Sequence, residues 1–64
     1  MTVPPWLSTV IQSEGSNFVA WCPELDIASQ GDSVEEAHSN LREALELFFE
    51  TADPSEIDQR LRRR

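Results

Sequence analysis

A lone cysteine and several carboxylates crowd one short stretch of the chain, where they could bind a metal ion or activate a nucleophile. Glu24, Asp26 and Asp32 carry the oxygen ligands that Mg²⁺ prefers, so they could serve a metal-dependent nuclease. Their spacing is not specific, and no histidine or lysine nearby in the sequence completes an acid–base set. Turn and helix-start chemistry explains these acids better. We therefore predict no metal site, no catalytic residue and no cofactor, and rank the nuclease last of three alternatives.

The thiol of Cys22 could act as a nucleophile if a neighbouring base lowered its pKa. His38 is the only histidine, and it is predicted to flank the apolar stripe of a helix. A lone cysteine that closes an apolar strand is usually a small buried hydrophobe. One cysteine and one histidine also fall short of the four ligands of a structural zinc site. The chain is therefore not expected to be an enzyme.

Three short strands are the first elements that must position these residues. Apolar and polar residues alternate over residues 7–13, which predicts a strand, and residues 14–17 have the turn chemistry that joins hairpin strands. Residues 18–22 (FVAWC) are apolar without alternation, as is typical of a central strand covered on both faces. Pro23 ends this strand, because it cannot donate to a ladder, and a third strand is predicted over residues 27–30.

The pattern then changes to that of a helix. Ser33 and Glu36 form a capping box, in which the serine hydroxyl can accept from the backbone of Glu36 and the glutamate can reach back. Apolar residues recur on one predicted face, which should lie on the sheet: Val34, Ala37, Leu41, Ala44, Leu45 and Phe48. The helix is expected to end near Thr51. A second, short helix should begin after Asp53, which precedes a proline, and run into the terminal arginines.

These elements predict an α+β fold in a single domain over residues 1–64. It is a three-stranded antiparallel meander with one long helix on one face and a short C-terminal helix. A chain of 64 residues buries only about 60% of the surface that its unfolded form exposes, so its own core should be marginal. Such domains usually need a disulfide, a metal or a partner subunit, and the first two are not predicted here. A homodimer is therefore expected.

One helix can cover only one face of such a sheet, which leaves apolar residues for a partner. Alternation along the central strand places Trp21 on one face and its neighbours on the other, and Leu47 points away from the apolar stripe of the helix. Tryptophan is enriched at binding hot spots. We therefore predict that a partner contacts these apolar residues and the acidic turn after the central strand, at Trp21, Glu24, Leu25, Asp26 and Leu47.

The charge of the chain also points to a particular kind of partner. The net charge is −7, lysine is absent, and four of the five arginines fall in the last five residues. An acidic body of this kind repels nucleic acid and favours a basic partner. The arginine tail could bind phosphates or fold back onto the acidic body. No signal peptide and no membrane span are expected, and a soluble cytoplasmic protein is predicted.

The stretch FVAWCPELDIASQGDSVEEAHSNLREALELFFE (residues 18–50) resembles the HicB antitoxin family. Members of this family typically show aromatic-V-A-aromatic, then C/V-P-E/D-L, S-Q-G-D-S/T-V-E-E-A and an N-L-x-E-A helix. The resemblance covers about half of the chain without a gap. None of these motifs is catalytic, and the specificity lies in their order rather than in any one residue.

The resemblance implies a βββα unit, a partial ribonuclease-H-like arrangement without that enzyme's active site. It also implies that the protein neutralises a HicA-type toxin, a small basic protein that cleaves mRNA, by masking its catalytic surface. Longer relatives carry a C-terminal DNA-binding domain, which is not expected here. An antitoxin of this kind is the leading hypothesis, and a stand-alone, homo-oligomeric HicB-like interaction module is the second. In either case an open sheet edge could be paired between subunits.

Overall fold

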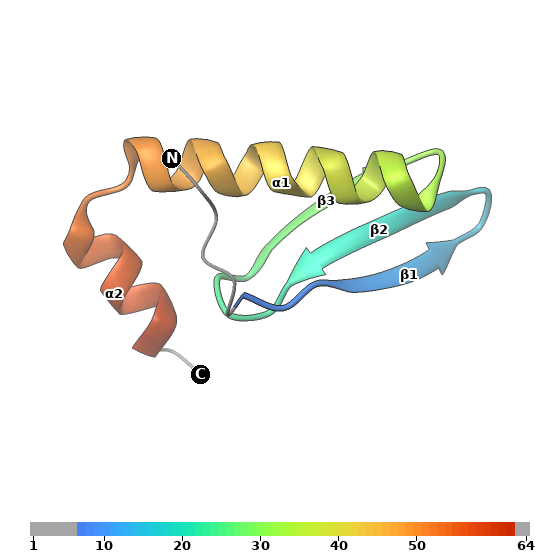
Figure 1. The fold of residues 1–64 in the computed structure, drawn as a ribbon. Coiled ribbons are helices and arrows are strands. Elements are labelled where there is room, and N and C mark those ends of the chain that lie inside the picture. The colour runs from blue at the N-terminus through green and yellow to red at the C-terminus, as the bar shows by residue number, and fades with distance from the viewer. Residues whose placement is uncertain (1–6, 63–64) are drawn as a thin grey trace.

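Three antiparallel strands and two helices follow one another along the chain (Figure 1). The computed structural model describes residues 7–62. The strands are β1 (Val10–Glu14), β2 (Asn17–Cys22) and β3 (Ile27–Gly31), and the helices are α1 (Val34–Thr51) and α2 (Pro54–Arg62). The sheet has the order β1-β2-β3, with β2 in the centre. The predicted α+β fold, a three-stranded meander followed by a long and a short helix, is confirmed.

A two-residue turn at Gly15 and Ser16 joins β1 to β2. Glu14 pairs with Asn17, so the turn is shorter than the four residues predicted. Gly15 has φ +60° and Ser16 does not have a positive φ, which is the pattern of a type II′ turn with glycine at its first position. The predicted first strand is also shifted, since β1 begins at Val10. β2 ends at Cys22, which lies opposite Thr9, so residues before Thr9 have no strand opposite them to pair with.

The capping box at the start of α1 forms largely as predicted. The backbone N–H of Glu36 donates to the Ser33 hydroxyl at 3.0 Å. The Glu36 carboxylate accepts from the backbone N–H of Asp32 at 2.6 Å, one residue earlier than in the usual motif. α1 then runs to Thr51, the predicted end, and Val34 at its first position is 43% exposed although it was predicted on the buried face.

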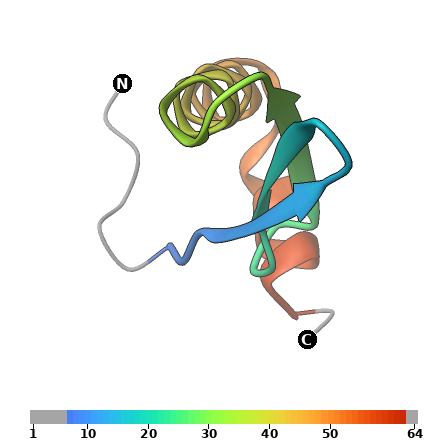
Figure 2. The same ribbon diagram turned by 90° about the vertical axis from the view of Figure 1, so that its right-hand side faces the viewer.

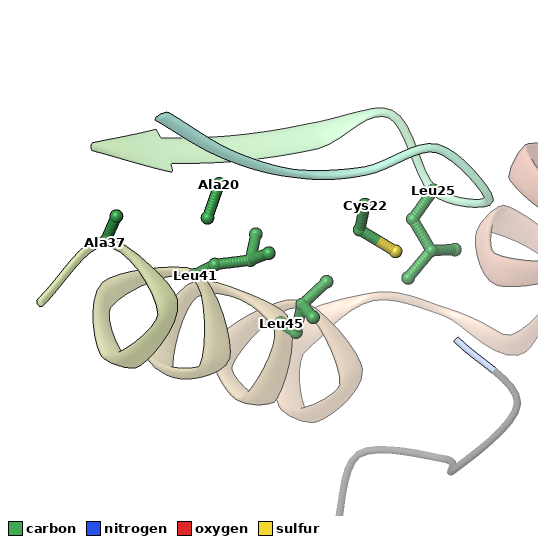
Figure 3. Close-up of a cluster of buried hydrophobic side chains, with 6 residues drawn as sticks. All are labelled: Ala20, Cys22, Leu25, Ala37, Leu41 and Leu45. Atoms are coloured by element: carbon green, nitrogen blue, oxygen red, sulfur yellow. The ribbon is translucent and has the colours of Figure 1, made fainter. Parts of the chain in front are cut away.

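The core is thin and lies between the sheet and α1 (Figure 3). Three of its six buried side chains are small, which limits the apolar area that folding removes from water. The six are Ala20, Cys22, Leu25, Ala37, Leu41 and Leu45. Figure 3 shows Ala37 at one end of this cluster and Leu25 at the other.

α1 does not cover the sheet evenly. It packs mainly on β3 and β2 and has few contacts with β1 (Figure 2). α2 turns down past the end of the sheet where β2 meets β3 (Figure 1). The face of the sheet opposite α1 is called the outer face below, and no described helix covers it.

Candidate functional site

A row of apolar side chains crosses the outer face of the sheet at one end. Val10 pairs with Trp21, and Trp21 pairs with Ala28, so the three residues lie side by side on neighbouring strands. Trp21 is 39% exposed and Val10 is 37% exposed. These three residues are named the sheet patch. Strand alternation left open which set of β2 side chains faces α1, and the structure places Ala20 and Cys22 in the core and Trp21 on the outer face.

The remainder of the outer face is more polar. In the next row Val19 lies between Gln12 and Gln30, and the last row pairs Glu14 with Asn17. Apolar exposure on this face is therefore concentrated next to the turn formed by residues 23–26. Interface cores are typically apolar and aromatic with a polar rim, and the outer face has this arrangement.

Asp26 places a carboxylate beside the sheet patch. Its backbone is in the left-handed region, with φ +57°, and its N–H donates to the carbonyl of Cys22 at 2.8 Å, which closes the turn. Its Oδ1 accepts a long hydrogen bond of 3.4 Å from the indole Nε1 of Trp21. The side chain of Asp26 is exposed. Two of the predicted contact residues, Trp21 and Asp26, therefore lie together at the surface.

Glu24 has a structural role that the sequence did not predict. Its carboxylate accepts from the Ser8 hydroxyl at 2.7 Å and from the Ser8 backbone N–H at 3.0 Å. These hydrogen bonds lower the pKa of Glu24 to about 2, because they stabilise the ionised form. The thiol of Cys22 also lies 3.6 Å from Oε1. Turn chemistry alone therefore does not describe Glu24, because its carboxylate also fastens the segment before β1 to the turn after β2.

Leu25 is buried, with 1% of its surface exposed, so the prediction that it contacts a partner is wrong. The turn directs Leu25 into the end of the core, where it is one of the largest fully buried side chains. Only the turn's geometry decides this, because the sequence pattern of residues 23–26 has no period. A lone leucine between two acids, just after a proline, is the one hint that an apolar contact forms there.

Arg60 is a second residue whose role only the structure reveals. Its guanidinium donates from Nη1 to the carbonyl of Leu25 at 2.9 Å. The guanidinium carbon also lies 5.0 Å from the ring centroid of Phe48, within the range of a cation–π interaction. Of the two roles considered for the arginine tail, folding back onto the body is therefore what Arg60 does. Arg62 pairs with Asp58 at 2.9 Å, and residues 63–64 of the tail lie outside the described residues.

Leu47 is exposed by 60%, but it does not share a surface with Trp21. Leu47 follows the buried Leu45 by two residues, about 200° around α1, so it points away from the sheet, whereas the sheet patch lies on the outer face of the sheet. Glu43 and Glu50 lie one turn from Leu47 along α1, so this apolar side chain has acidic neighbours. The predicted contact residues therefore divide into two surfaces, and Trp21 with Asp26 forms one of them.

The residues weighed for catalysis lie at different ends of the sheet. Asp32 follows β3 beside the start of α1, while Glu24 and Asp26 lie in the turn at the far end. Within residues 7–62, no group of three or more potential metal ligands comes together. Cys22 is fully buried, and burial raises the pKa of its thiol. His38 is exposed and directly follows Ala37, which Figure 3 shows at the end of the core away from Cys22, so His38 and Cys22 do not form a nucleophile–base pair.

Neither helix within residues 7–62 is long and apolar enough to span a membrane. No protein-family model, curated protein or solved structure matches this chain.

Proposed function

We propose that this protein binds a small, basic, mRNA-cleaving toxin of the HicA type and masks its catalytic surface. The resemblance of residues 18–50 to the HicB antitoxins suggests this partner. The observation that carries the proposal is the exposed indole of Trp21 beside the carboxylate of Asp26. This pairing offers apolar area and a negative charge at one place on the outer face.

The sheet patch can supply the affinity for such a partner. Tryptophan in the centre of an interface commonly contributes about 2 kcal/mol or more to binding. Val10 and Ala28 flank Trp21 in the same row and would exclude water from the contact. A basic side chain of the toxin would then meet Asp26 at the rim.

The net charge of the chain would speed its association with a basic partner and help it to reject acidic ones. A protein with a net charge of −7 attracts a basic partner from a distance, which raises the association rate more than the affinity. The association rate should therefore fall as salt is added, whereas the dissociation rate should change little. Glu43 and Glu50, the acids beside Leu47, add to this attraction without being part of the contact.

The proposal predicts that the neighbouring reading frame encodes a small basic ribonuclease, and co-expression with that ribonuclease tests it. The wild-type chain should restore growth and form a complex with the ribonuclease, and Trp21→Ser should lose both. Val34→Ser is the matched control, because Val34 is similarly exposed but lies at the opposite end of the molecule. Failure of the wild-type chain to form a complex would refute the proposal. Loss of inhibition in Leu47→Ser with retention in Trp21→Ser would move the contact to α1.

A stand-alone, homo-oligomeric interaction module is the second candidate function. It is favoured by the thin core and by the open edge of the sheet at β1. This second function is supported if the wild-type chain self-associates but neither binds nor inhibits the ribonuclease.

A further inference from the structure

The two edges of the sheet differ in how they are protected. Antiparallel pairs alternate between those that exchange hydrogen bonds and those that do not, and the pair that closes a two-residue turn exchanges them. Glu14 and Asn17 close the turn, so Gln12 and Val10 also bond to β2. The backbone groups of Ile11 and Ser13 consequently point outward from the sheet.

The same reasoning identifies the outward groups of β3. Here the bonded residues are Ile27, Ser29 and Gly31, which leaves Ala28 and Gln30 facing outward. The carbonyl of Gln30 accepts a hydrogen bond of 2.9 Å from the side-chain amide of Asn40 on α1. This bond confirms the alternation and shows that α1 covers part of the β3 edge.

The β1 edge has no such cover from the described residues. None of the hydrogen bonds between residues 7–62 reaches the outward groups of Ile11 or Ser13. α1 packs mainly on β3 and β2, so it does not cover the β1 edge either (Figure 2). β1 also lacks the lysine, proline or bulge with which proteins usually protect an edge strand.

We propose that the β1 edge pairs with β1 of a second copy of this chain, so that two sheets join into one. The strands run antiparallel about a two-fold axis at Gln12, where the two glutamines face each other. Ile11 of each copy then exchanges hydrogen bonds with Ser13 of the other, which satisfies all four outward groups of these residues. Isologous contacts of this kind are self-complementary by symmetry.

This register suits a second copy in spite of its negative charge. Glu14, the only charged residue of β1, faces Val10 of the second copy rather than an acid. The two Glu14 side chains lie at opposite ends of the strand pair, about 13 Å apart along it, which exceeds the Debye length at physiological salt. The joined sheet also places both copies of the sheet patch on one continuous outer face.

Cysteine cross-linking of the full chain tests the register without any toxin, so its failure would leave the proposed function standing. Facing residues in a non-bonded pair have Cα atoms about 4.5 Å apart, which a disulfide can bridge. Gln12→Cys should therefore form a covalent dimer in air. Gln30→Cys is the matched control, because Gln30 lies in the same outer-face row but at the other edge, and it should not cross-link.

Analytical ultracentrifugation measures how much the β1 edge contributes to the affinity of the dimer. The wild-type chain should be a dimer at micromolar concentrations. Ser13→Pro should raise the dimer dissociation constant about tenfold or more, because it removes one outward donor from each copy. It should leave the pairing with β2 intact, since that N–H does not face β2. A monomeric wild type, or a dimer in which Gln12→Cys does not cross-link, would overturn the proposal.

Discussion

α1 approaches the sheet closely at Gly31, and Gly31→Ala should destabilise the fold strongly. A Cβ atom on Gly31 would lie 2.6 Å from the backbone nitrogen of Ala37 and 2.9 Å from two atoms of Glu36. Carbon and other heavy atoms prefer separations of about 3.5 to 4.0 Å, so the added methyl overlaps its neighbours. Two of these three atoms belong to the backbone of α1, which cannot rotate away as a side chain can.

The magnitude follows from the overlap. Overpacking usually costs about 1 to 3 kcal/mol, and a clash with helix backbone belongs at the upper end of that range. The helix must move by about 1 Å, while Ala37 and Leu41 are held in the core by the same turn of helix. A domain of 64 residues has a free energy of unfolding of about 3 to 10 kcal/mol, so a loss of about 3 kcal/mol is a large share.

Gly15→Ala is the matched control, because it adds the same methyl at the only other glycine. No atom lies within 4 Å of a Cβ at Gly15, but its φ of +60° is unfavourable for alanine. Its cost should therefore be about 1 to 2 kcal/mol and should come from the backbone alone. Urea unfolding followed by circular dichroism would measure both variants. If Gly31→Ala unfolds within about 0.5 kcal/mol of the wild type, or costs less than Gly15→Ala, the close approach of α1 to β3 is refuted.

Three further predictions concern side chains that hold the molecule together. Arg60→Ala should lower the free energy of unfolding by about 2 kcal/mol, because it removes a charged hydrogen bond and a cation–π contact. Arg62→Ala removes only an exposed pair within α2, so it should cost less than about 0.5 kcal/mol in the same urea experiment. The pKa of Glu24 falls from 4.5 to about 2 on folding, so its contribution to stability should be complete above pH 4.5 and should disappear as the pH falls towards 2. Glu24→Gln should therefore approach the wild type in stability as the pH is lowered. A difference in stability that stays constant with pH would contradict this assignment. The thiol of Cys22 should react with a disulfide reagent only when the chain unfolds, so that its rate rises with urea together with the loss of ellipticity, and fast reaction in native buffer would show that Cys22 is accessible.

Signals carried by neighbouring residues were sufficient to predict the elements of this protein. The Ser33 box marks the start of α1, Pro23 marks the end of β2, and the proline after Asp53 marks the second helix. Each of these signals acts within about four residues, where backbone geometry and capping bonds are local. Strand alternation also placed Trp21 on the face opposite Ala20 and Cys22, since successive side chains of a strand point to opposite faces, but it left open which face α1 covers.

Contacts between distant segments could not be predicted from the sequence, and they determine which residues of the candidate site are exposed. The bonds from Ser8 to Glu24 span 16 residues, and the bond from Arg60 to Leu25 spans 35. Whether Leu25 faces the core or a partner depends on where the turn meets α1 and α2, which no local pattern encodes. The uncovered β1 edge likewise results from the lateral placement of α1 on the sheet. The sequence by itself determined which elements form and which faces are apolar, whereas the tertiary structure decided which groups are already occupied, because occupancy depends on segments that meet only after folding.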